Sequence, residues 1–199
     1  MTHHGRRRLS VATVAALLTG GAVTGAQNRV PAAPIEYRVL ATSKTSTMEK
    51  ELNEVGEAGF RFQAVMGGET AFGGSEAVAI TSRAAGAARH YQYRLLATNK
   101  TSTMQAELQK AAESGFEFRG QTVFASTFGG KEVVCILERD DERPVSAASE
   151  YQLVATSKTS TLQKELQTLG DQGFEALGLT VAQTAFGGSE LVVIARRPK

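Results

Sequence analysis

The pentapeptide Lys44-Thr45-Ser46-Thr47-Met48 is the first of three near-identical copies in this chain. The second copy is Lys100-Thr101-Ser102-Thr103-Met104, and the third is Lys158-Thr159-Ser160-Thr161-Leu162. Each copy opens a short amphipathic segment that stops at a Gly-Phe pair. The pentapeptide therefore marks the same helix start in three tandem units.

The spacing of the copies defines the repeat. Tyr93 follows Tyr37 by 56 positions and Tyr151 follows Tyr93 by 58, and no gap is needed within a unit. Two connectors absorb the difference in length. The predicted organisation is a signal peptide at 1–26, a flexible lead-in at 27–36, repeat units at 37–84, 93–140 and 151–199, and linkers at 85–92 and 141–150.

Every unit carries the signals of a strand, a helix and two further strands. The aromatic and branched residues at 37–42 and in its copies predict the first strand. Ser46 and Glu49 have the spacing of a capping box, and apolar residues follow at helical intervals. Gly59 is placed to end the helix in a left-handed conformation, as are Gly115 and Gly173.

The third strand of each unit is expected to lie at the centre of its sheet. Segments 133–137 and 191–195 are apolar at every position, so both of their faces should be covered. Ala77 and Ala79 make the first copy less apolar, which predicts looser packing there. The sequence thus predicts an α+β fold of three tandem βαββ units, each a three-stranded sheet with one covering helix. Because a helix covers only one face, we expect the units to pack on one another about a pseudo-threefold axis.

The amino terminus has the pattern of a secretory signal peptide. Arg6-Arg7-Arg8 precedes an apolar run at 11–18 and a series of small residues before Gln27. A membrane anchor is the competing interpretation, but the run is shorter than the ~20 residues of a spanning helix. The arginines leave twin-arginine export open beside the general route. We expect a bacterial protein of the periplasm or the cell exterior, with no membrane span after cleavage.

Charge and cysteine content narrow the classes of partner. The signal peptide would remove three of the 22 basic residues, which leaves 19 against 20 acidic ones. Such a balance does not favour nucleic acid or an anionic membrane surface. Cys135 is the only cysteine, so no internal disulfide can form. Its apolar neighbours favour a buried small hydrophobe over a redox role.

The pentapeptide has the chemistry of an anion site. A helix start presents free backbone N–H groups and the positive end of the helix dipole, beside hydroxyl and ammonium groups. The stretch lacks the glycines of a nucleotide P-loop, and the alternative is that serine only caps the helix while lysine is solvated. The candidate ligand-binding residues are Lys44, Thr45, Ser46, Lys100, Thr101, Ser102, Lys158, Thr159 and Ser160.

An aromatic residue recurs beside two glycines in each predicted hairpin loop. These residues are Phe72, Phe128 and Phe186. At a loop tip, each ring would be suited to recognise a sugar, a peptide or a protein surface. The alternative is that each ring folds over the helix start and completes the core. The order of elements places hairpin and pentapeptide at the same end of the unit.

Residues suited to catalysis are scarce. The histidines are His3, His4 and His90, and the first two would leave with the signal peptide. A single histidine does not supply an ordinary histidine–cysteine metal cluster or most nucleophile–histidine arrangements. Recurring glutamates such as Glu76 are more typical of solvated charges than of a general base. We expect no enzyme, no metal and no cofactor.

The unit resembles the bacterial family catalogued as domain of unknown function 4177, whose members are small βαββ units. The resemblance rests on Tyr37, on Leu52-Asn53-Glu54-Val55-Gly56-Glu57-Ala58-Gly59-Phe60, on Arg83 and on their counterparts in the later copies. It extends over 37–197 apart from the connectors. Phe60 stands where the family commonly shows tryptophan. The resemblance implies a fold and no particular activity.

These observations together predict an exported, non-enzymatic interaction or structural module. Its partner would be a protein whose identity the sequence does not specify. The alternative is a small anionic ligand held by the pentapeptides and the Phe-Gly-Gly hairpins. A concave positive pocket at the loop end would favour the ligand, whereas a flat apolar surface would favour a protein partner.

Overall fold

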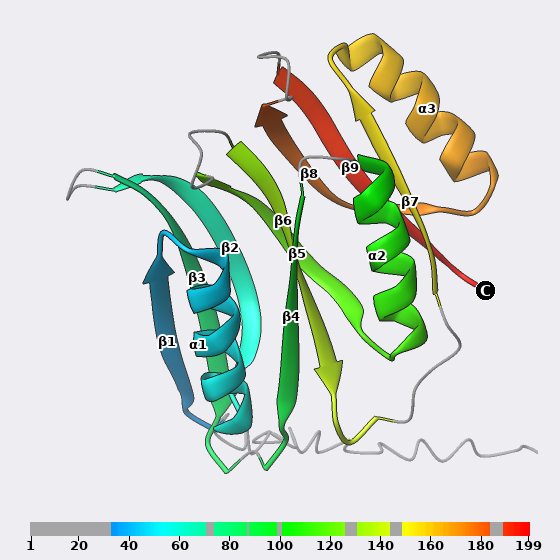
Figure 1. Ribbon diagram of the computed structural model, residues 1–199. Helices are drawn as coiled ribbons and strands as arrows, with labels where there is room; N and C mark the ends of the chain where they lie inside the picture. The colour runs from blue at the N-terminus through cyan, green and yellow to red at the C-terminus, as the bar shows by residue number, and fades with distance from the viewer. Residues whose placement is uncertain are drawn as a thin grey trace, which may run out of the picture. The chain divides into compact units, whose positions relative to one another are not determined.

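Each repeat unit folds as strand, helix, strand and strand, as the sequence predicts (Figure 1). Unit 1 contains β1 (Ile35–Thr42), α1 (Thr45–Glu57), β2 (Arg61–Thr70) and β3 (Gly74–Ala84). Unit 2 contains β4 (Tyr91–Thr98), α2 (Thr101–Glu113), β5 (Glu117–Ala125) and β6 (Lys131–Asp140). Unit 3 contains β7 (Ser149–Thr156), α3 (Thr159–Asp171), β8 (Glu175–Gln183) and β9 (Ser189–Pro198).

The computed structural model describes residues 33–70, 74–86, 88–98, 101–125, 131–143, 149–183 and 189–199. All of them belong to one compact domain, Ala33–Lys199, which contains the three repeat units. The predicted signal peptide at 1–26 lies outside the described residues. Within the described ranges, no helix is long and apolar enough to cross a membrane.

Each sheet is antiparallel and has its third strand in the middle, as predicted. The strand orders are β1-β3-β2, β4-β6-β5 and β7-β9-β8. In unit 1, Thr42 at the end of β1 pairs with Ala77, and Thr70 at the end of β2 pairs with Gly74. The helix start and the β2–β3 hairpin therefore share one end of the unit, which confirms the expected topology.

The Gly-Phe pair ends each helix in the predicted way. Gly59 has a φ of 84°, in the left-handed region where a side chain would be strained. The Phe60 N–H then donates to the Val55 carbonyl at 2.9 Å, and the Gly59 N–H donates to Gly56 at 3.0 Å. This is the Schellman pattern of helix termination, and α2 and α3 end with the same hydrogen bond from Phe116 and Phe174.

The arginine near the end of each unit completes this helix end. The Arg83 guanidinium lies 4.6 Å from the centre of the Phe60 ring and donates to the Ala58 carbonyl at the helix terminus. Arg197 stacks on Phe174 at 4.5 Å in unit 3 in the same way. One cation–π contact and one hydrogen bond thus explain why glycine, phenylalanine and arginine recur together.

The two faces of each sheet have different neighbours. We call the face that carries the unit's own helix the front and the opposite face the back. Met48 and Leu52 of α1 pack on the front of sheet 1, in one core with Val134 and Ile136 from the back of sheet 2. The front of sheet 2 shares a second core with Val192 and Ile194 on the back of sheet 3 in the same way, through Met104 and Leu108 of α2.

The units follow one another in a row, and the expected pseudo-threefold closure was wrong. The substantial contacts between units join α1 to β4 and β2 to β5, and then α2 to β7 and β5 to β8. Among the described residues, no such contact joins unit 1 to unit 3. The reason is directional: each unit covers the back of the next with its front. Within the described ranges, the back of sheet 1 and the front of unit 3 are therefore left without a neighbour.

Candidate functional site

The pentapeptide lies at the helix start in every unit, and the helix begins two residues earlier than predicted. α1 begins at Thr45, with Lys44 as its N-cap in an extended conformation and without a side-chain capping hydrogen bond. α3 begins in the same way at Thr159 after Lys158. Ser46 and Ser160 are exposed residues of the first turn, so they are not the caps.

The predicted capping box is wrong because its acidic member has another partner. The Glu49 carboxylate accepts a hydrogen bond from the Leu95 N–H of β4 at 2.7 Å. Gln105 of α2 likewise accepts from the Leu153 N–H of β7 at 3.2 Å. This helix position therefore connects one unit to the next, and it does not close its own helix end.

The described residues do not test the predicted anion site. Lys100 and the three hairpin residues Phe72, Phe128 and Phe186 lie outside the described residues, as does the side chain of Thr101. Lys44 and Lys158 are exposed, whereas Thr45 is half-buried. Anion binding at the pentapeptides and recognition by the hairpin rings both stay predictions.

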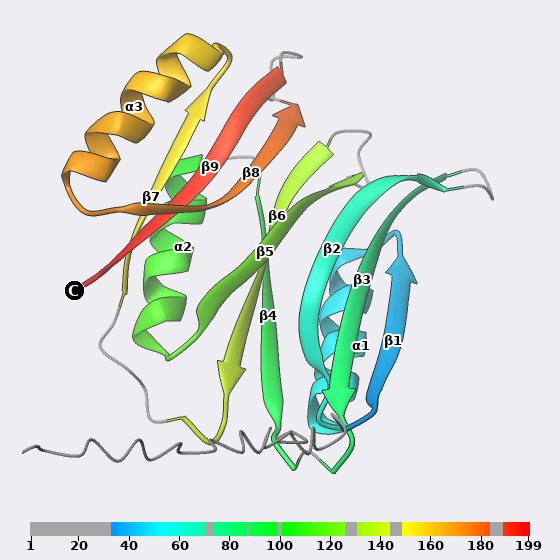
Figure 2. The ribbon, with the colours of Figure 1, turned by 180° about the vertical axis from the view of Figure 1, so that it is seen from behind.

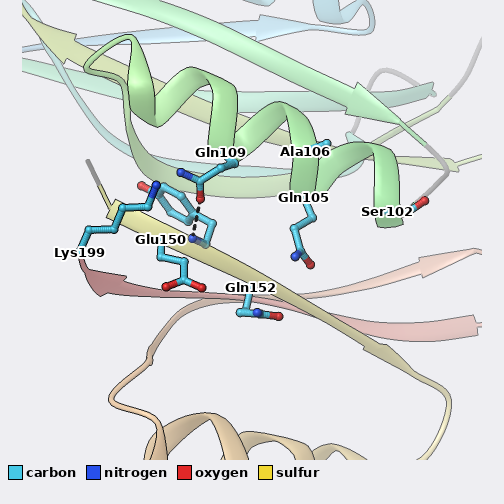
Figure 3. A pocket seen from close by; sticks show the side chains of 8 residues that line it. Ser102, Gln105, Ala106, Gln109, Glu150, Gln152 and Lys199 are labelled. Carbon is cyan, nitrogen blue, oxygen red and sulfur yellow. Dashed lines mark hydrogen bonds between the residues drawn. The ribbon is translucent and has the colours of Figure 1, made fainter. Parts of the chain in front are cut away.

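Of the predicted residues, Ser102 borders a pocket of about 520 Å³ between α2 and β7. Gln105 and Gln109 line its α2 side, and Glu150 and Lys199 lie opposite them (Figure 3). Gln109 points at the β7 backbone and bonds to it (Figure 3). The pocket is thus the open part of the seam between units 2 and 3.

Side-chain amides on the helices hold the edge strand of the following unit. Asn53 of α1 makes two hydrogen bonds to one residue of β4: its Oδ1 accepts from the Tyr93 N–H and its Nδ2 donates to the Tyr93 carbonyl, both at 2.9 Å. Gln109 of α2 accepts from the Tyr151 N–H at 3.3 Å and donates to Ser149 at 3.2 Å. The outward backbone groups of β4 and β7 are thereby satisfied.

Sequence reasoning missed this role of the helices. The available signal was a polar side chain four residues after another, at matching positions of each helix: Glu49 with Asn53, Gln105 with Gln109, and Gln163 with Gln167. A spacing of four places both side chains on one helix face. Polar pairs at this spacing also occur on ordinary solvent-exposed helix faces, so the pattern alone does not identify a helix face that binds a strand.

The first tyrosine of units 2 and 3 anchors each unit to its predecessor. The buried Tyr93 hydroxyl accepts from the Phe62 N–H at 2.8 Å and donates to the Glu138 carboxylate at 3.1 Å. The Tyr151 hydroxyl accepts from the Phe118 N–H at 3.0 Å. Both donors, Phe62 and Phe118, lie at a β-bulge, where an N–H group leaves the ladder. Burial and the Glu138 charge raise the pKa of Tyr93 above its ordinary 10.0.

Replacing Tyr93 with phenylalanine is expected to lower the free energy of unfolding by about 1–3 kcal/mol, because the Phe62 N–H is left buried without an acceptor. The raised pKa adds a pH effect. Unfolded tyrosine ionises near pH 10 while folded Tyr93 stays protonated, so this stability is complete below pH 10 and is lost as pH rises further.

Urea unfolding of wild type, Tyr93→Phe and Tyr37→Phe between neutral pH and pH 11 measures both effects. Tyr37 occupies the same position of unit 1 but is exposed, so its replacement should leave stability unchanged. Two results would contradict the anchoring role of Tyr93. One is an equal loss of unfolding free energy in the two variants. The other is an unfolding free energy that falls equally steeply above pH 10 in wild type and in Tyr93→Phe.

A buried charge cluster also lies between units 1 and 2. Glu138, on the back of sheet 2, is 2.9 Å from the Arg61 guanidinium of unit 1 and 3.4 Å from that of Arg119. With the Tyr93 hydroxyl, its two oxygens have three partners. Because both Glu138 oxygens are paired with side chains of the protein, we interpret this cluster as a structural contact between units 1 and 2.

The thiol of the single cysteine is shielded from solvent. Cys135 is fully buried against Met104, with the two sulfur atoms 3.3 Å apart, and burial raises the pKa of its thiol. This confirms the prediction of a buried small hydrophobe. In the parts of the chain that the structure describes, no group of three or more histidine, cysteine, aspartate or glutamate residues could hold a metal ion.

The back of sheet 1 is the face that points away from α1 (Figure 2). Its side chains form an exposed apolar surface. Tyr37 is 64% exposed, whereas its counterparts Tyr93 and Tyr151 are 4% and 3% exposed. A shallow, mainly apolar hollow of about 410 Å³ lies over β2 and β3 on this face. We call this surface the open back face; its large hydrophobic residues are Ile35, Tyr37, Val39, Met66 and Ile80.

The comparisons with known proteins identify no relative. No family model, no curated protein and no solved structure matches this chain. The resemblance to the family of domain of unknown function 4177 therefore rests on the quoted residues alone. The open back face becomes the candidate functional site because its counterparts in units 2 and 3 are both interfaces.

Proposed function

We propose that this protein is an exported, non-enzymatic interaction module that binds a protein partner through the open back face. The observation that carries the proposal is the exposure of this face. Ile80 is 39% exposed, while Ile136 and Ile194 at the same position of units 2 and 3 are 0% exposed. Units 2 and 3 thus use this face as an interface, whereas no described residue covers it in unit 1.

The chemistry of the open back face suits a protein and does not suit a small ion. Its large residues are apolar and aromatic, and they extend over all three strands of sheet 1. Contiguous apolar surfaces of this kind on soluble proteins mark contact sites for other macromolecules. β1 is in addition an edge strand whose outward backbone groups are available for hydrogen bonds.

Site-specific photo-crosslinking in the native cell tests this proposal. A photoreactive residue replacing Tyr37 should form a protein adduct. One replacing Lys50 on α1 should not, because Lys50 lies outside the open back face. Lys50 is a fair control since 77% of its side chain is exposed, so it is accessible as well. Adducts at neither position, or equal adducts at both, would show that the open back face is not an interaction surface.

A further inference from the structure

We infer that the partner of the open back face is the front of unit 3 in a second copy of this chain. This inference rests on the proposed function and names its partner. The structure contains the same contact twice, between units 1 and 2 and between units 2 and 3. A contact between copies would continue the series, with unit 3 of one chain covering unit 1 of the next.

The exposed hydrophobic residues separate onto these two faces. Among the described residues, seven large hydrophobic side chains are exposed. Five belong to the open back face, and the other two, Leu179 and Val181, lie on the front of sheet 3. The counterparts of Leu179 contact the next unit: Val65 packs in the core shared with unit 2, and Gln121 donates to the Val192 carbonyl at 3.0 Å.

α3 keeps the polar side chains that hold an edge strand in α1 and α2. Gln163 and Gln167 occupy the positions of Glu49 and Asn53, and both are exposed. Gln167 bonds only to Asp171 of its own helix, at 3.0 Å, and Gln163 makes no hydrogen bond within the described part of the chain. With Gly170, Leu179 and Val181 they form what we call the open front face.

Gly170 shows that no described residue packs on this helix face. A Cβ atom added at Gly56, its counterpart in α1, would overlap the Tyr91 carbonyl oxygen and lie 2.9 Å from the Tyr93 ring. A Cβ atom added at Gly170 would meet nothing within 4 Å. Both sites have glycine, but only in α1 does a strand pack against it. β1 of a second copy would fill this place on α3.

β1 matches the strands that α1 and α2 receive. Tyr37 and Val39 stand at the positions of Tyr93 and Leu95, whose N–H groups bond to α1. These N–H groups point away from β3 because β1 lies at the sheet edge. In the contact between copies, Gln167 and Gln163 would accept from Tyr37 and Val39.

The bulge of unit 3 is also compatible with this contact. In the internal contact, the Phe118 ring packs against Gly178, where an added Cβ atom would lie 3.1 Å from the ring. The corresponding pair between copies is Ala176 with Ala64, and both residues are exposed. Two small side chains introduce no overlap, and the Ala176 N–H corresponds to the Phe118 N–H that binds a tyrosine hydroxyl.

The contact joins two different faces, so it is heterologous. Each copy would use one open front face and one open back face, and association would extend into a ring or an open filament. This geometry separates it from a symmetric dimer, which would pair two open back faces. A pair of complementary variants can therefore distinguish the two arrangements.

Sedimentation equilibrium on the purified protein, over concentrations up to roughly 100 µM, tests the inference. The variants are Tyr37→Asp on the open back face, Gly170→Arg on the open front face, and Glu54→Arg on the solvated side of α1 as a control. Wild type and the control should increase in mass beyond one chain. Tyr37→Asp and Gly170→Arg should each stay at the mass of one chain, with thermal unfolding showing that both are folded.

An equimolar mixture of Tyr37→Asp and Gly170→Arg decides the arrangement. Each variant keeps one intact face, so the mixture should reach the mass of two chains and no more. Wild type that stays at one chain, a Gly170→Arg variant that associates like wild type, or a mixture without dimer would each overturn the inference. The proposed function would fail separately, if photo-crosslinking at position 37 gave no adduct to any protein.

Discussion

Replacing Ile136 with alanine is expected to lower the free energy of unfolding by about 2–5 kcal/mol. Ile136 is on the back of sheet 2 and is fully buried in the core shared with α1. Its truncation leaves a cavity between two units that cannot close without moving both. Ile194→Ala is expected to have a similar effect in the core between units 2 and 3.

Ile80 is the matched control, because it occupies the same strand position in unit 1. It faces solvent on the open back face, so Ile80→Ala should cost less than about 1 kcal/mol. Urea unfolding at low protein concentration, where copies do not associate, measures all three values. Similar losses at Ile80 and Ile136 would mean that the units do not cover one another as described.

Substitution of two equivalent glycines is expected to change stability in opposite directions. Gly56→Leu should destabilise the protein by about 1–3 kcal/mol, since the new side chain has to displace the β4 backbone at Tyr91. Gly170→Leu should stabilise it by about 0.5–1 kcal/mol, because glycine is a poor helix former and the surrounding space is empty.

Thermal unfolding of dilute samples measures this contrast directly. Leucine is chosen because Ala112 occupies the same position of α2, so the packing between units tolerates one methyl group there. If both substitutions destabilised the protein, α3 would have a neighbour that the described residues do not include. If both stabilised it, α1 would not pack against β4.

The architecture within a unit could be predicted from the sequence because its signals are local. The strand-helix-strand-strand order, the glycine at each helix end and the central third strand all follow from patterns a few residues long. The continuous apolar run at 133–137 also indicated that both faces of β6 are covered, and they are.

The packing of the units could not be predicted in the same way. The sequence indicates that the back of each sheet needs a neighbour, but a closed threefold ring and an open row satisfy that need equally in units 2 and 3. The distinguishing residues are in unit 1, where Ala77 and Ala79 suggested loose packing. In fact both alanines are buried against α1, and it is the opposite face of β3 that is open.

The candidate site was predicted least well. The pentapeptide is the most regular motif of the sequence, yet Ser46 and Ser160 are not caps. Among the described candidate residues, Ser102 borders a pocket. The open back face consists of residues that look like ordinary strand residues, such as Tyr37 and Val39. Only the three-dimensional comparison with Tyr93 and Leu95 distinguishes an exposed copy from a buried one.

Hydrogen exchange of individual backbone amides, followed by NMR at low and high protein concentration, tests the packing of the units and the association of copies together. Four edge-strand amides donate hydrogen bonds to side chains of α1 and α2, and we expect them to exchange slowly at every concentration. They are the amides of Tyr93, Leu95, Tyr151 and Leu153.

The equivalent amides of Tyr37 and Val39 should exchange fast in dilute wild type and become protected as concentration rises, but not in Gly170→Arg. Fast exchange of Tyr93 and Leu95 would contradict the packing of α1 against β4. Protection of Tyr37 and Val39 in the dilute single chain would show that the row of units does not end in two open and complementary faces.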